Sequence, residues 1–195
     1  MLRGMSTPPA SSAGAAPRTP LKQGRLCLRP TTPADCPFVV SVERHPDNVP
    51  HVEDWSEEQH RAALDRPGIA HWIIEHNGLA VGYAVLEGTE DPNASLLLRR
   101  IAIVSKGRGI GRGALLLIAR FCFDVLGFHR LWLNVATGNR RAFNVYRRLG
   151  FVEEGVARES VRVGDRFISM RVLSMLDREY RALYGGVSVN KRSRG

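Results

Sequence analysis

A strand that runs into a glycine-rich turn and then into an apolar helix constrains this chain more than any other feature. Residues 96–104 are mostly apolar and indicate the strand, and glycine then occupies alternate positions from Gly107 to Gly113. The apolar run 114–123 indicates the helix. Glycine lets the backbone approach a ligand closely, and the first turn of a helix offers unpaired N–H groups and the positive end of the helix dipole. Together these features suit a pyrophosphate.

The turn by itself does not decide between phosphate binding and a plain connection from strand to helix. Its glycines do not match the Walker pattern, which requires Gly-Lys-Ser/Thr after four intervening residues. The Rossmann pattern is not met cleanly either, and no acidic residue follows at the expected distance.

A second segment bears on whether the turn binds phosphate or only connects strand and helix. Residues 130–135 indicate another strand, and the next residues indicate a helix that Asn139 can cap and Gly150 can end. Within it, Ala142 and Tyr146 lie one turn apart and share a face.

With both segments in order, the chain resembles the GNAT superfamily of acetyl-CoA-dependent N-acetyltransferases. The family motif Arg/Gln-x-x-Gly-x-Gly/Ala is matched by Lys106, Gly109 and Gly111, with lysine in the first place. The motif Asn-x-x-Ala-x-x-x-Tyr followed by Gly-Phe is matched by Asn139, Ala142, Tyr146, Gly150 and Phe151. The stretches 98–101, 129–131 and 153–155 are similar to the branch that holds ribosomal-protein N-terminal and spermidine/diamine acetyltransferases. The resemblance covers roughly residues 24–182 and is strongest over 96–155.

The resemblance implies acetyl-CoA as co-substrate, no metal, and a set of site residues. Tyr146 matches the position whose hydroxyl often protonates the leaving thiolate, and a phenol of ordinary pKa stays protonated at neutral pH. Backbone groups of the strand before the turn would pair with pantetheine and polarise the acetyl carbonyl, which falls on Ile101, Ala102 and Ile103. The turn would hold the pyrophosphate through Lys106, Gly107, Arg108, Gly109, Ile110, Gly111, Arg112 and Gly113. Asn139 could cap its helix, hydrogen-bond the cofactor, or do both. Arg140, Asn144 and Arg147 are candidates for outer contacts with the coenzyme A phosphate, with a solvated surface as the equal alternative.

The order of expected elements predicts the fold class. Ser56 and Gln59 match a capping box at a helix start, and Asn77-Gly78 between two apolar runs is a strong hairpin signal. The order β-α-α-β-β-β-α-β-α-β-β predicts an α/β fold with a single mixed, mostly antiparallel sheet and helices on both faces. We expect one N-acetyltransferase domain over residues 23–184, a disordered tail over 1–22 and a basic tail over 185–195.

Composition adds bounds on location and partners. The net charge is +9, almost all of it from arginine, which permits an anionic cofactor or nucleic acid. No apolar run reaches the roughly 18 residues of a membrane-spanning helix. The odd number of cysteines without metal-ligand spacing favours reduced thiols, with Cys122 buried in the apolar helix, and a cytoplasmic chain.

The acceptor and the general base are left open. A protein or peptide N-terminus is the first expectation, and a polyamine is the alternative, for which acidic residues among positions 45–58 would suit. A non-catalytic acyl-CoA sensor or an RNA-associated module is a hypothesis from another class, although nucleic acid is disfavoured because no aromatic residues interleave a basic strand. A homodimer is possible. The base could be drawn from His51, Glu53, Glu57, His71, Glu75, Glu87 and Glu154.

Overall fold

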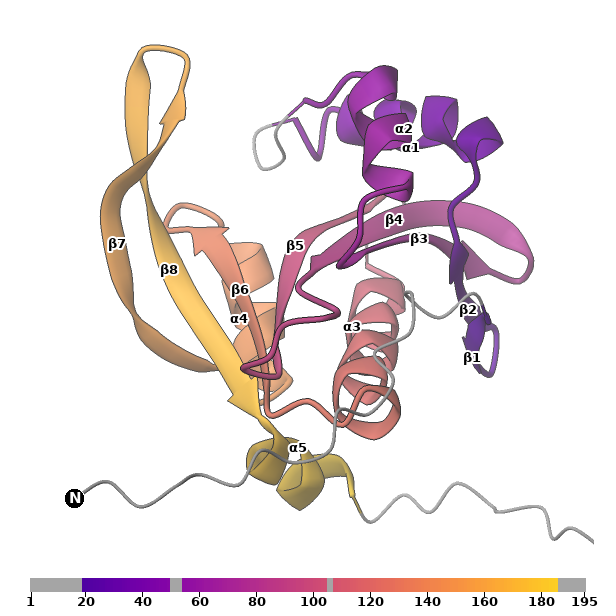
Figure 1. The fold of residues 1–195 in the computed structure, drawn as a ribbon. Coiled ribbons are helices and arrows are strands. Elements are labelled where there is room, and N and C mark those ends of the chain that lie inside the picture. The colour runs from indigo at the N-terminus through magenta and orange to yellow at the C-terminus, as the bar shows by residue number, and fades with distance from the viewer. Residues whose placement is uncertain (1–18, 50–53, 105–106, 186–195) are drawn as a thin grey trace, which may run out of the picture.

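The computed structural model describes residues 19–49, 54–104 and 107–185 and contains one eight-stranded sheet with the strand order β1-β2-β3-β4-β5-β6-β8-β7 (Figure 1). β5 and β6 are parallel neighbours, and every other neighbouring pair is antiparallel. The strands are β1 (Leu21–Gln23), β2 (Leu26–Pro30), β3 (Ile69–His76), β4 (Leu79–Glu87), β5 (Ser95–Ile103), β6 (Arg130–Ala136), β7 (Val152–Val163) and β8 (Arg166–Leu176). The helices are α1 (Cys36–Glu43), α2 (Glu57–Leu64), α3 (Ile110–Arg120), α4 (Arg140–Arg148) and α5 (Asp177–Tyr184).

Short-range signals explain several element boundaries. Asn77 and Gly78 have φ angles of 55° and 77°, so both adopt the left-handed conformation that a tight β3–β4 hairpin requires. The Ser56 hydroxyl accepts the N–H of Gln59, and the Gln59 side chain accepts the N–H of Ser56 at the start of α2. Asn139 caps α4 by accepting the N–H of Ala142. These three local predictions are confirmed.

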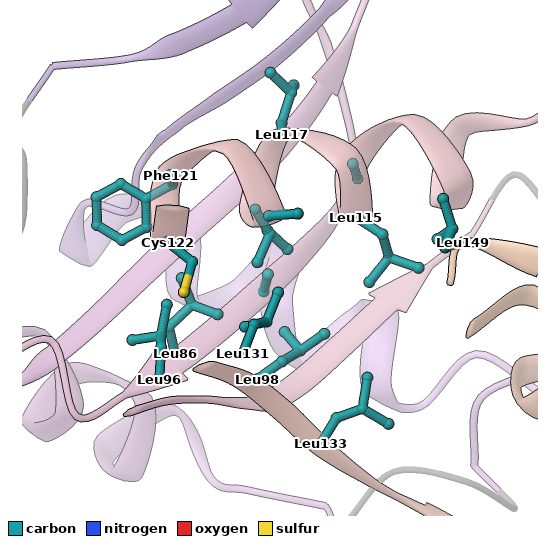
Figure 2. Packing of buried hydrophobic residues seen from close by; sticks show 14 of the residues in the cluster. Leu86, Leu96, Leu98, Leu115, Leu117, Phe121, Cys122, Leu131, Leu133 and Leu149 are labelled. Carbon is teal, nitrogen blue, oxygen red and sulfur yellow. The ribbon is translucent and has the colours of Figure 1, made fainter. Parts of the chain in front are cut away.

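Helices cover both faces of the sheet and divide the core in two. The larger hydrophobic cluster packs α3 against β3, β4, β5 and β6. Figure 2 shows Leu115 of α3, and Cys122 of the π-helical turn Phe121–Val125 that continues it, above the strand residues Leu86, Leu98 and Leu131. The smaller cluster, on the other face, joins α1 to the sheet. The predicted fold class is therefore confirmed.

The sheet forks between its two parallel strands. Residues Ser95–Leu98 of β5 pair with Arg130–Leu133 of β6, but β5 continues to Ile103 and β6 to Ala136 without further pairing between them. The unpaired ends leave backbone edges that face each other across an open fork. We call this region, residues 99–103 of β5 and 134–136 of β6, the fork.

A β-bulge lies where the fork begins. Leu98 pairs with Leu86 and Arg100 pairs with Val85, so Arg99 is an extra residue in β5. The bulge reverses the alternation of side chains: Leu98 joins the cluster under α3, whereas Ala102 joins the cluster under α1. Arg100 is thereby turned to the α1 face.

Some expectations meet the limits of the described residues or shift by a few positions. β1 begins at Leu21, two residues inside the segment expected to be a tail. Residues 1–18 and 186–195 of the two expected tails, as well as His51, Glu53 and Lys106, lie outside the described residues. Cys122 is buried with a free thiol, and burial raises its pKa. Within the described ranges, no helix is long and apolar enough to cross a membrane.

Candidate functional site

The start of α3 has the geometry expected of an anion cradle. Gly107 and Gly109 have φ angles of 89° and 72°, a backbone conformation that residues with a side chain adopt only with strain. The first intrahelical bond runs from the Gly113 N–H to the Gly109 carbonyl at 3.0 Å, so the N–H groups of Ile110, Gly111 and Arg112 have no intrahelical acceptor. The side chain of Ile110 is buried in the core, and only its backbone can face a ligand.

Gly113 does not fit the donor role that its place in the turn suggested. Its N–H is used inside the helix, at 3.0 Å from the Gly109 carbonyl. A Cβ atom at Gly113 would lie 2.3 Å from Cδ1 of Leu26, so the missing side chain allows α3 to sit close to β2. Gly113 therefore serves packing, because the helical ladder already uses its donor.

The three β5 residues expected at the cofactor differ in where their backbone groups point. The Val104 N–H donates to Val81 of the neighbouring β4 segment at 2.9 Å. Backbone groups alternate in an antiparallel pair, so those of Ala102 also belong to the β4 ladder, and those of Ile101 and Ile103 point toward the fork. Ala102 thus has no free backbone group for a ligand in the fork.

Tyr146 lies on α4 and is buried, with 8% of its surface exposed. Its ring packs edge-to-face on Phe151 at 5.9 Å between centroids. No hydrogen bond joins its hydroxyl to another of the described residues, and the hydroxyl oxygen is not among the fully buried polar atoms that lack a partner. Burial raises the pKa of Tyr146 to about 12, which keeps the hydroxyl protonated and able to donate.

The exposed residues of α4 form two strips. Arg140, Phe143, Asn144 and Arg147 recur at helical spacing beside β8, where with Thr137 and Arg171 the first three line a hollow of about 200 Å³. The Arg147 side chain already donates to the Phe151 carbonyl at 3.1 Å. The second strip contains Arg141, Val145 and Arg148, which helical spacing places on the flank away from Phe143 and β8.

Charge gathers around the same helix starts. Five exposed arginines there have no carboxylate within ion-pair distance among the described residues. These are Arg108, Arg112, Arg140, Arg141 and Arg148. Elsewhere, Arg29, Arg61, Arg130 and Arg181 are paired with acids. Glycines at left-handed φ, free N–H donors and unpaired cations together fit a polyanion such as coenzyme A.

A buried polar cluster on the α1 face was not anticipated from the sequence. We call it the Glu43 cluster; its members are Glu43, Trp55, His60, His71, Tyr83 and Arg100. The cluster leaves only a weak signal in the sequence, because Glu43 is the last residue of an apolar helix and its partners lie at scattered positions between residues 55 and 100. Only the folded chain brings them together.

The Glu43 carboxylate is the centre of this cluster. Its Oε1 accepts hydrogen bonds from the Tyr83 hydroxyl and from Arg100 Nη1, the latter at 3.1 Å, and its Oε2 accepts the Trp55 N–H at 2.9 Å. His60 Nε2 lies 3.3 Å from Oε1. Burial alone would raise the pKa of Glu43, but His60, Tyr83 and the Trp55 N–H outweigh it and hold the pKa below its usual range.

Most of the acidic residues that the sequence offers as a general base form ion pairs with arginines. Glu75 pairs with Arg29, Glu57 with Arg61 and Glu154 with Arg130. Glu87 lies 3.9 Å from Arg99. His71 is buried in the Glu43 cluster, and burial lowers its pKa to about 3, so it is neutral at physiological pH.

Comparison with known proteins places this geometry in a family. Residues 25–152 match the acetyltransferase (GNAT) domain model. A spermidine N(1)-acetyltransferase from Vibrio cholerae is 30% identical over 80 residues, which cover 41% of this chain and only 46% of that protein. The Bacillus subtilis protein named "Putative ribosomal N-acetyltransferase YdaF" is 28% identical over 130 residues, 66% of this chain and 68% of that protein.

Solved structures agree on the fold. The Vibrio cholerae spermidine N-acetyltransferase in complex with CoA and spermine superposes with a TM-score of 0.72 at 21% identity, covering 80% of this chain and 98% of that one. A crystal structure of a protein named "putative acetyltransferase", 25% identical, gives a TM-score of 0.74 over 88% of this chain and 96% of that one. The family match spans most of the chain and includes the fork and the glycine turn; this chain belongs to the GNAT acetyltransferase family, whose members transfer an acetyl group from acetyl-CoA to an amine.

Proposed function

We propose that this protein acetylates the α-amine of a protein or peptide N-terminus. The observation that carries the proposal is the fork between β5 and β6, which opens beside the unpaired N–H groups at the start of α3. The fork offers the free backbone edge that an extended pantetheine chain would need, and the turn offers donors for its pyrophosphate. When bound, acetyl-CoA supplies the thioester carbon that the amine attacks.

Each part of the site has a separate task in this proposal. The N–H groups of Ile110, Gly111 and Arg112, with Arg108, would hold the pyrophosphate. Backbone groups of Ile101 and Ile103 would orient the thioester and stabilise its oxygen as charge develops. Tyr146 would donate its proton to the departing sulfur as the carbon–sulfur bond breaks, and its protonated hydroxyl supports this role. The amine nitrogen would lose its proton to water.

The contacts with the rest of coenzyme A fall on α4 in this proposal. Asn139 would stay at the cap, where its side chain already orders the first turn. Arg141 and Arg148, on the flank of α4 away from β8, would contact the cofactor, whereas Asn144 and Arg147 lie on the flank beside β8, where Arg147 already donates to Phe151. The latter two stay as the sequence-based alternative.

Charge on the acceptor side supports a peptide amine over a polyamine. A polyamine needs carboxylates that are free to bind cations. Of the acids in the segment expected to provide them, Asp54 lies 3.3 Å from Arg44 and Glu57 lies 2.6 Å from Arg61, whereas Glu58 forms no ion pair with the described residues. The buried Glu43 is likewise occupied by Arg100. The polyamine alternative is kept because the relative from Vibrio cholerae is named as a spermidine acetyltransferase.

Calorimetric titration with acetyl-CoA tests the cradle. Gly111→Ala is the steric control, because a Cβ there meets only Cδ1 of Ile103 at 3.5 Å, an ordinary contact. Gly111→Asp adds a negative charge to the first turn, which favours the helix but repels a phosphate. We expect binding to survive in the alanine variant and to weaken by at least about tenfold in the aspartate variant. Equal affinity in all three proteins would argue against phosphate binding at this turn.

Acceptor screening tests the substrate class. Release of free CoA thiol is followed with a pool of short peptides with free N-termini, with the same peptides N-terminally acetylated, and with spermidine. We expect turnover only with the free peptides. Turnover with spermidine alone would replace the peptide by a polyamine, and binding of acetyl-CoA without turnover on any amine would favour a sensor.

A further inference from the structure

The Glu43 cluster lies on the face of the sheet from which an acceptor amine must come. A thioester held in the fork would lie in the plane of the sheet, and α3 with its hydrophobic core packs against one side of that plane. The amine must therefore approach from the side of α1 and α2. Arg100 is the first β5 residue after the bulge at the fork and projects to this side, where it reaches Glu43.

Three segments meet at the Glu43 carboxylate. Glu43 is the last residue of α1. Its carboxylate accepts the Trp55 N–H from the segment that leads into α2 and binds Arg100 of β5. The Arg100 guanidinium also stacks on the Trp55 ring, 3.9 Å from its centroid. One buried anion thus ties the connection between α1 and α2 to the strand that borders the fork.

The histidines extend this anchor across the sheet. His71 on β3 lies in register with Val85 of β4, and Val85 with Arg100 of β5, so the cluster follows one row across three strands. His60 Nδ1 lies 3.1 Å from His71 Nε2, and His71 Nδ1 lies 2.9 Å from Thr31 Oγ1. The row fixes α2 over the sheet from the fork as far as the turn after β2.

Stability alone is a weak reason for such a cluster. Burying charged groups costs desolvation energy, and well-packed apolar residues often stabilise a core at least as well. What hydrogen-bonded charges add is a defined geometry, which apolar contacts leave looser. That property matters most where an incoming nucleophile must be aligned with a carbonyl carbon.

We propose that the Glu43 cluster is a positioning device for the acceptor amine: Glu43 holds the buried Arg100 and the Trp55 ring in fixed positions beneath the acceptor side of the fork. The cluster takes no proton from the amine and leaves the cofactor side untouched. The inference rests on the acetyl transfer proposed above. Its signature is a selective loss of acceptor recognition when Glu43 or Arg100 is changed.

Steady-state kinetics of Glu43→Gln, Arg100→Gln and the double variant test this role. The acceptor is whichever of a free peptide or spermidine the wild type acetylates faster, and thermal unfolding is recorded in parallel. We expect each single variant to raise KM for the amine by roughly tenfold while KM for acetyl-CoA stays within about twofold. In the double variant the loss of unfolding temperature seen with Glu43→Gln is partly recovered, because neither charge is left, but the raised KM for the amine persists.

Asp35→Asn is the matched control. Asp35 binds Arg29 through two hydrogen bonds of 2.8 Å at the end of β2, three strands away from β5 in the sheet. We expect it to lower the unfolding temperature without changing KM for the amine. A rise in both KM values in parallel with lost stability, or unchanged KM values in folded variants, would overturn the positioning role alone. A wild type that acetylates no amine would overturn the proposed function and this inference together.

Discussion

Arg100 and Glu43 are 57 residues apart in the chain, yet Arg100 Nη1 donates to Glu43 Oε1 at 3.1 Å. The contact depends on the bulge at Arg99, since without the extra residue Arg100 would share the face of Leu98. The same bulge marks the point where β5 leaves β6. A single irregularity in one strand therefore coincides with the start of the fork and turns a charged side chain to the α1 face of the sheet.

Replacing Tyr146 by phenylalanine tests the proton donor. We expect kcat to fall by about 100-fold with KM for acetyl-CoA nearly unchanged, because the hydroxyl acts only as the sulfur departs. The wild-type pKa of about 12 also predicts no loss of rate from Tyr146 between pH 7 and pH 10, because the group stays protonated there. Rates of the two proteins over this pH range are the measurement. An alkaline decline seen in wild type and absent in the variant would contradict the raised pKa.

Gly82 on β4 tests how closely β4 must approach β5 near the fork. A Cβ there would lie 2.3 Å from the Ala102 carbonyl oxygen and 3.0 Å from Cα of Ile103, and this backbone cannot move aside cheaply. We expect Gly82→Ala to cost about 2 kcal/mol of unfolding free energy and to weaken acetyl-CoA binding by displacing Ile103. Gly138→Ala is the control, since no atom lies within 4 Å of its Cβ position. Denaturant unfolding of both variants, followed by acetyl-CoA titration, gives the comparison.

Paired arginine substitutions on α4 decide which strip contacts the cofactor. We expect Arg141→Gln with Arg148→Gln to weaken acetyl-CoA binding by roughly tenfold at low salt, because two cations without ion-pair partners among the described residues are lost from the flank of α4 away from β8. Arg140→Gln with Arg147→Gln removes the same charge on the β8 side and should have a smaller effect. Titrations at two ionic strengths measure both. The reverse order of the two pairs would support the assignment of Asn144 and Arg147 made from the sequence motif.

Acid should weaken the folded state through His71. Its pKa is lowered from the ordinary 6.5 to about 3, mainly by burial, so the unfolded chain binds this proton at a higher pH than the folded chain does. Stability from this group is complete above about pH 6.5 and is lost as pH falls toward 3. Between pH 7.5 and 5.0 the loss should be about 2 kcal/mol, from a shift worth ~1.4 kcal/mol per pH unit.

Denaturant unfolding at these two pH values measures this effect. The ordinary carboxylates stay ionised at both, so His71 dominates the difference, although Glu43, His60, Asp35 and Arg100 surround it. His71→Gln keeps a polar side chain but cannot gain the proton, so its stability should depend less on pH. An equal pH dependence in the variant would assign the acid sensitivity to the other groups.

Local sequence signals determined much of the fold. The left-handed turn at Asn77 and Gly78, the capping box of Ser56 and the cap at Asn139 involve residues a few positions apart, and their physics is complete within those segments. The glycine turn before α3 was found in the same way, because left-handed φ angles and free N–H groups are properties of a short stretch. The order of such segments was enough to predict the class of sheet.

Only the tertiary structure decided which residues of neighbouring strands can contact a ligand at the site and which serve packing. Which backbone groups of Ile101, Ala102 and Ile103 face the fork depends on pairing with β4, and the role of Gly113 depends on Leu26 of a distant strand. The Glu43 cluster could not be read from the sequence, because Glu43 closes an apolar helix and its partners become neighbours only across the sheet face. A hydrogen-bonded pair is a property of positions in space, and a bulge of one residue is enough to change which positions meet.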